Sequence, residues 1–224
     1  MLLEPTEESW EAVDKLLESG RQERFANQNL FCPVGKLSQR HNLGERAAHV
    51  QFDIEHTGIY YHAGDRCMLF VENRKTLIDK TLSALKAKPD HRIELTKSWR
   101  QALQKRLNKV VDPNMLLTEF LKYAKIRPLT HEILVNLYKI TSSCALRKIL
   151  CSHTGDQYEL WDALLLLQQD GYDVTRLWMS KAWQRENLCY LIPLESVKTY
   201  SISSAQEAYP LLDKLDLTVG RLVY

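Results

Sequence analysis

The sequence predicts an α/β protein, and three observations lead to this fold class. Residues 67–71 form an uninterrupted apolar run, which is typical of a strand covered on both faces. Residues 49–55 alternate between apolar and polar side chains, as in a strand buried on one face. Several later segments place their apolar residues three and four apart, which is the period of a helix. We therefore expect a mixed sheet flanked by helices.

The composition is that of an ordinary globular chain of 224 residues with a net charge of +2. A chain of this length forms one large domain or two small ones. Its longest apolar stretch, residues 163–167, is far shorter than the roughly 20 residues that span a bilayer, so no membrane is expected. The acidic residues 1–8 do not resemble a secretory signal. We expect a cytoplasmic protein whose five cysteines are buried thiols.

The first part of the chain is expected to form a helix and then a β-meander. Apolar residues at helical spacing predict a helix over residues 6–20. The alternating strand at 49–55 is followed by a glycine turn and by strands at 59–61 and 66–71. We assign residues 1–65 to this N-terminal region.

Residues 66–224 are expected to form the α/β domain proper. A helix at about 77–85 and a short strand at 93–96 precede a helical insert at about 98–140, whose third helix Thr130 is placed to cap. The elements predicted after this insert are a strand at 148–152, a helix at 159–169, strands at 172–179 and 188–192, and a closing helix at 205–215.

Two acidic residues follow predicted buried strands. Glu72 comes directly after the strand at 66–71, and Asp156 follows the strand at 148–152. Open α/β sheets bind their ligands at the carboxyl ends of parallel strands, so the two carboxylates would meet if the strands were parallel neighbours. Paired carboxylates suit Mg²⁺, which prefers oxygen ligands. The pattern predicts a magnesium site and phosphoryl chemistry.

Residues 71–77, VENRKTL, resemble the first motif of Toprim domains, the metal-binding module of topoisomerases and primases. Residues 154–156, TGD, with the helix and strand after them, resemble the second motif. The similarity covers about residues 66 to 183 and is strongest to the Toprim variants in nuclease subunits of Wadjet-type plasmid-defence systems. It implies a magnesium-dependent, DNA-acting protein with Glu72 and Asp156 as catalytic residues and metal ligands.

The second motif departs from the family pattern. Toprim domains carry a second acid two residues after the first, and here Tyr158 stands at that position. Glu159 or Asp162 on the following helix would have to replace it as a metal ligand. A degenerate domain that keeps only a binding surface is the alternative.

A second nuclease pattern uses the same glutamate. Asp53 together with Glu72 and Arg74 resembles the acid and acid-x-lysine arrangement of restriction-type nucleases, with arginine in place of lysine. Arginine holds its proton too tightly to take over the role of that lysine. Both patterns indicate nucleic acid as the substrate.

Basic residues near these motifs are candidate DNA contacts, because lysine and arginine neutralise phosphates. The candidates are Arg74, Lys75, Lys97, Arg100, Lys105, Arg106 and Lys109. A solvated helix face explains the last five equally well. The function that this pattern predicts is a DNA-acting or DNA-binding protein of a defence or DNA-maintenance system. The alternative is a non-catalytic adaptor that binds a protein partner through the helical insert.

Other catalytic motifs are absent from the sequence. The seven histidines include no pair four residues apart on a helix, so zinc hydrolase chemistry is not expected. His153, three residues before Asp156, is the one histidine near a candidate site. There is no glycine-rich phosphate loop, nucleophile elbow or Rossmann fingerprint.

Overall fold

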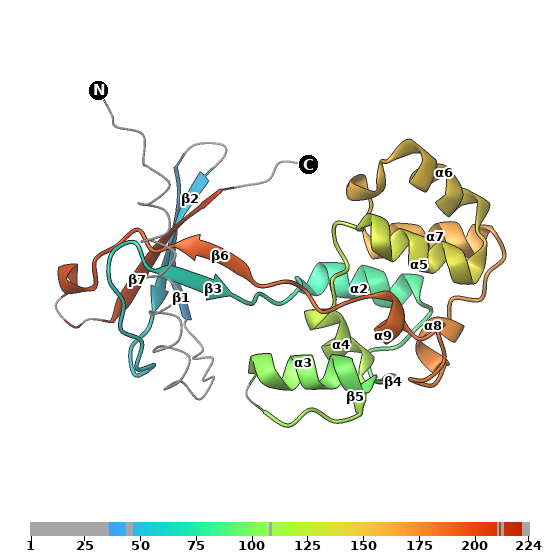
Figure 1. Ribbon diagram of the computed structural model, residues 1–224, viewed down its shortest axis with the longest axis horizontal. Coiled ribbons are helices and arrows are strands. Elements are labelled where there is room, and N and C mark those ends of the chain that lie inside the picture. Colours follow the sequence, from blue (N-terminus) through green and yellow to red (C-terminus); the bar gives the residue numbers. More distant parts are fainter. Residues whose placement is uncertain (1–35, 44–46, 108, 210, 212, 221–224) are drawn as a thin grey trace, which may run out of the picture. The chain divides into compact units, whose positions relative to one another are not determined.

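The computed structural model describes residues 36–43, 47–107, 109–209, 211 and 213–220. Within these residues the protein combines helices with small antiparallel sheets, so the predicted α/β class is confirmed (Figure 1). The helix expected at 6–20 lies outside the described residues.

Five strands form two antiparallel sheets beside a small apolar core. These strands are β1 (Lys36–Asn42), β2 (Ala47–Asp53), β3 (Arg66–Leu69), β6 (Lys198–Ser201) and β7 (Lys214–Gly220). They form an antiparallel sheet in the order β1-β2-β7 and an antiparallel pair β3-β6. A bridge between Ile202 and Leu217 joins the pair to β7. Ile54, Tyr61, Ile202, Leu215 and Leu217 are the buried residues of this core.

A larger apolar core lies among the helices. Its elements are α2 (Lys75–Ala84), α3 (Lys97–Leu107), α4 (Leu117–Tyr123), α5 (His131–Thr141), α6 (Cys144–Ser152), α7 (Leu160–Gln169), α8 (Arg176–Met179) and α9 (Leu188–Leu191), with the strand pair β4 (Arg92–Glu94) and β5 (Asn114–Leu116). Phe120, Leu137 and Leu164 are wholly buried in this core. No helix in the described part of the chain is long and apolar enough to cross a membrane.

Most elements predicted for residues 75–141 are confirmed. Helices α2 to α5 and strand β4 lie where the apolar spacing placed them. Thr130 caps α5 as predicted, because its side chain accepts a hydrogen bond from the backbone N–H of Ile133 at 3.4 Å.

The strand predicted at 148–152 is wrong, because these residues form the last part of helix α6. The helix starts at a cap that the prediction missed: the Ser143 hydroxyl accepts a hydrogen bond from the backbone N–H of Leu146 at 3.1 Å. Leu146 and Ile149, three residues apart, are buried, and Cys151 is exposed. Only one helical face is covered, so the short apolar run did not indicate a strand.

The strands predicted at 172–179 and 188–192 are also wrong. Asp173 accepts hydrogen bonds from the backbone N–H and the hydroxyl of Thr175, and this local turn leads into α8. Asn187 caps α9 in a similar way by accepting from the backbone N–H of Cys189. The strand-helix-strand unit expected around α7 is therefore absent from the described residues.

Gln206 explains why residues 59–61 do not form the predicted strand. Its side-chain oxygen accepts from the backbone N–H of Tyr61 at 2.9 Å, and its amide nitrogen donates to the carbonyl of Ile59 at 3.2 Å. A side chain thus takes the place of a neighbouring strand. The closing helix predicted at 205–215 is replaced by a 3-10 turn, η2 (Gln206–Ala208), and by β7.

The prediction that all cysteines are buried holds for only one of the four that the structure describes. Cys144 and Cys151 are exposed on α6, Cys67 is half-buried, and Cys189 is buried. All four are free thiols. Burial raises the pKa of the Cys189 thiol to about 12.

We expect Cys189 to react with a thiol reagent at least about a hundredfold more slowly than Cys144 and Cys151, because the thiolate is the nucleophile and burial suppresses it. Peptide mass spectrometry after timed alkylation of the folded protein measures each site separately. Unfolding in urea should remove the difference. Equal rates in the folded protein would contradict the burial of Cys189.

Candidate functional site

Glu72 is exposed in the segment between β3 and α2, and its side chain contacts helix α4. Its Oε1 atom accepts a hydrogen bond from the Tyr123 hydroxyl at 2.9 Å. Burial, and then this hydrogen bond, raise the pKa of the Tyr123 phenol well above its usual range. The ring of Tyr123 stacks on Phe70 with centroids 5.5 Å apart. Glu72 therefore belongs to a contact between the segment after β3 and the end of α4.

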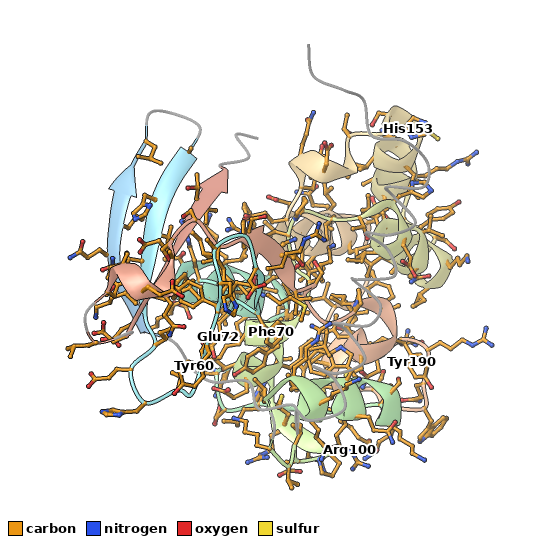
Figure 2. All side chains as sticks on the ribbon, turned by 60° about the vertical axis from the view of Figure 1, so that its left-hand side comes forward. Tyr60, Phe70, Glu72, Arg100, His153 and Tyr190 are labelled. Atoms are coloured by element: carbon orange, nitrogen blue, oxygen red, sulfur yellow. The ribbon has the colours of Figure 1, made fainter. Side chains whose placement is uncertain are left out.

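The residues proposed as metal ligands with Glu72 lie on other elements. Asp156 is exposed in the 3-10 turn η1 (Gly155–Gln157), which follows α6. Figure 2 shows Glu72 well apart from His153, the C-cap residue that follows α6. Among the described residues there is no group of three or more His, Cys, Asp or Glu side chains that could hold a metal ion.

Glu159 and Asp162 stabilise the start of α7. The Asp162 carboxylate accepts from the backbone N–H of Glu159 at 3.0 Å, at the N-terminus of the helix. Glu159 accepts from the indole N–H of Trp161 at 2.7 Å and lies 3.7 Å from the Arg127 guanidinium. Asp162 is therefore a helix-capping group, and Trp161 and Arg127 hold the Glu159 carboxylate beside the same helix end.

Six of the predicted basic contacts are distributed along two helices. Arg74 and Lys75 stand at the start of α2, Lys97, Arg100 and Lys105 lie on α3, and Lys109 follows α3. The seventh, Arg106, points into the protein. It donates a hydrogen bond to the Glu195 carbonyl, and its guanidinium lies 4.9 Å from the centre of the Phe70 ring.

Asp53, the acid of the second nuclease pattern, lies on β2. Its carboxylate is 3.3 Å from the Lys214 ammonium on the neighbouring strand β7. Glu72, in contrast, contacts Tyr123 of the helical core. The two acids thus have separate partners.

The β3-β6 pair carries a set of side chains that sequence reasoning missed. Residues directly opposite each other are Arg66 and Ser201, Cys67 and Tyr200, Met68 and Thr199, and Leu69 and Lys198. Opposite residues share a face of the ladder. Cys67, Leu69 and Tyr200 pack against the small core, and Arg66, Met68, Thr199 and Ser201 are exposed.

Tyr200 and Lys198 combine an aromatic ring with a cation on one face of this ladder. They are two residues apart on β6, so their side chains point to the same side. The Tyr200 ring is half-buried, and the Lys198 side chain is 54% exposed. The alternation of Tyr200 and Ile202 with Ser201 and Ser203 could have predicted this strand, since it has a period of two.

The described residues define a class of protein: an α/β protein with a small antiparallel β core, beside which the β3-β6 ladder presents an aromatic ring and a cation. The model of the FAD binding domain family matches residues 34–220, which is most of the chain. The chain belongs to the FAD binding domain family. No curated protein matches it.

The family match corrects the functional predictions made from the sequence. The Toprim resemblance is wrong, and with it the expected DNA partner, magnesium cofactor, nuclease activity, defence role and adaptor function. The predicted magnesium site depended on strands at 148–152 and 172–179, which the structure does not contain. Both segments are helical or turn structure, and β3 pairs antiparallel with β6. Within the part of the chain that the structure describes, no parallel strands therefore bring Glu72 and Asp156 together.

Proposed function

We propose that this chain is the FAD-binding part of a flavin-dependent oxidoreductase. The family match over residues 34–220 is the observation that carries the proposal. FAD, when bound, supplies hydride and electron transfer through its isoalloxazine ring. The protein has to provide binding, orientation and the electrostatic environment.

The residues of the β3-β6 ladder fit what such a cofactor requires. FAD has a flat ring system and a pyrophosphate with two negative charges. Tyr200 offers a ring that the small core supports from one side, and Lys198 offers an ammonium group two residues away on the same face. We propose that Tyr200 contacts the ring system and that Lys198 pairs with the pyrophosphate.

The free thiols support the expected location of the protein. Cys67, Cys144, Cys151 and Cys189 form no disulfides, and two of them are exposed. Exposed free thiols persist in a reducing compartment. We therefore propose that the protein is cytoplasmic.

We expect Lys198→Ala to weaken FAD binding by about 5- to 30-fold, because one charge-assisted contact with the pyrophosphate is lost. Binding of riboflavin, which has no phosphate, should not change. Titration of the purified chain with each ligand, followed by the quenching of flavin fluorescence, measures both affinities. Lys139→Ala, which removes an exposed lysine on α5, is the matched control.

Substitutions of Tyr200 separate the binding of the ring system from the binding of the pyrophosphate. Tyr200→Ala should weaken FAD and riboflavin binding together, by about fivefold or more, and Tyr200→Phe should preserve both because it keeps the ring. Failure of the unmodified chain to bind FAD at micromolar concentrations would contradict the proposed function. Binding that is equally unaffected by Lys198→Ala and Tyr200→Ala would place the flavin elsewhere.

A further inference from the structure

Lys198 already has an anionic neighbour within the chain. Its ammonium nitrogen lies 3.8 Å from the Glu195 carboxylate and donates a hydrogen bond to the Ser196 hydroxyl at 3.2 Å. The same Glu195 oxygen accepts from the backbone N–H of Ser196 at 2.9 Å and from its hydroxyl at 3.2 Å. A cation, a hydroxyl and a carboxylate thus form a small network at the start of β6.

The residue that carries the carboxylate is held more firmly than the cation. The Glu195 side chain is only 13% exposed. Its backbone N–H donates to the Tyr123 carbonyl at 2.7 Å, and its own carbonyl accepts from Arg106. Leu194 forms a bridge with Ala124. The segment around Glu195 is therefore fastened to the end of α4 and to α3.

Lys198 can leave this pair more readily than Glu195 can. Its side chain is mostly exposed, and a lysine ammonium is carried on a flexible stem of four carbons. A pair at 3.8 Å whose cation is mostly exposed is weak, because water screens the ammonium group. A pyrophosphate presents more charge and more acceptor oxygens than one carboxylate, so it is the stronger partner for the ammonium.

We propose that Glu195 is an internal counter-ion that holds Lys198 when no cofactor is bound and that the FAD pyrophosphate displaces. Glu195 is then a positioning residue that lowers the affinity for the anionic part of the cofactor. The inference rests on the proposed function, since it needs Lys198 to face the pyrophosphate. It adds a competing group that sets how tightly FAD is held.

The test is the substitution Glu195→Gln, which removes the charge and keeps the backbone contacts. We expect FAD to bind about two- to fivefold more tightly, because the ammonium no longer has to be released from a carboxylate. Riboflavin affinity should stay the same. In a Lys198→Ala background, Glu195→Gln should have no further effect of this size. Flavin fluorescence titration supplies all of these affinities without an activity assay.

Two further variants keep the test decisive. Ser196→Ala removes the hydroxyl that links Lys198 to Glu195, so it should also raise FAD affinity. This variant supplies the test if Glu195→Gln does not fold. Glu119→Gln breaks a matched pair, Glu119 and Lys122 on α4, whose charged atoms are 2.6 Å apart, and it should leave FAD affinity unchanged.

The outcomes separate this inference from the proposed function. If Lys198→Ala weakens FAD binding and Glu195→Gln leaves it unchanged or weakens it, the counter-ion role is overturned and the proposed function stands. If the unmodified chain does not bind FAD, both are overturned. Tighter FAD binding in Glu195→Gln, with riboflavin unchanged and dependence on Lys198, supports the counter-ion.

Discussion

Asn187→Asp is expected to lower the free energy of unfolding by about 3–5 kcal/mol at neutral pH, since it leaves a charge in a buried polar network. Asn187 is wholly buried at the start of α9. Its amide nitrogen donates to the carbonyls of Ser180, at 2.7 Å, and Glu94, at 3.2 Å. An aspartate still accepts from the backbone N–H of Cys189 but turns its second oxygen toward two carbonyls. Urea unfolding followed by tryptophan fluorescence measures the loss.

The effect of Asn187→Asp should depend on pH in a defined direction. Burial and the two carbonyls raise the pKa of the new carboxyl above its value of about 3.9 in the unfolded chain. The penalty is therefore small below about pH 4 and grows as the pH rises, because only the unfolded state releases the proton freely. Asn136→Asp, on the half-buried face of α5, is the control and should cost less than about 1 kcal/mol. A pH-independent loss at Asn187 would contradict this explanation.

Asn73→Ala is expected to lower the free energy of unfolding by about 2–4 kcal/mol, because it removes the donor of two hydrogen bonds to carbonyls at the end of helix α4. The Asn73 amide donates to the carbonyls of Leu121, at 2.8 Å, and Ala124, at 2.7 Å. Leu121 and Ala124 are wholly buried, so water cannot fully replace these hydrogen bonds. Thermal and urea unfolding of the variant measure the change.

Arg74→Ala is the matched control for Asn73→Ala. Arg74 is the next residue, is exposed, and makes no side-chain capping hydrogen bond at the start of α2. Its replacement should change the free energy of unfolding by less than about 0.5 kcal/mol. Equal losses in the two variants would show that the segment tolerates no substitution, and would contradict a specific role for the Asn73 amide.

Apolar spacing predicted the helices that pack one face against the larger core. In α2 and α5 the buried residues repeat at three and four positions, and helix formation follows from that face. The strand at 49–55 was predicted for the same kind of reason, since Ile54 and Phe52 contact the small core. These elements could be predicted because their periodicity and their burial agree.

The elements that were missed depend on contacts distant in the sequence or on local caps. Short apolar runs such as 148–152 and 188–192 have no clear period, and the caps at Ser143 and Asn187 decide that they are helical. The segment at 59–61 is held by Gln206, a partner that no local pattern indicates. Gln206 lies on η2, far along the chain.

The candidate site was missed because the conspicuous motif had a structural role. Glu72 and Asn73 form the polar end of an apolar strand in the sequence, which resembles a ligand site. In the structure they contact Tyr123 and Leu121 of α4 and its C-cap residue, Ala124. Tyr200 was part of no predicted strand. Its importance depends on pairing with Cys67, which brings together residues from distant parts of the sequence.

The pairing of β3 with β6 also bears on how the chain reaches its folded state. More than half of the sequence separates the two strands, and the helices of the larger core all lie within that interval. Closing so long a loop costs more conformational entropy than forming contacts between near neighbours along the chain, and it is therefore slower. The helical portion can therefore assemble early and bring Leu69 and Lys198 close together, so the ladder that presents Tyr200 would be among the last parts to form.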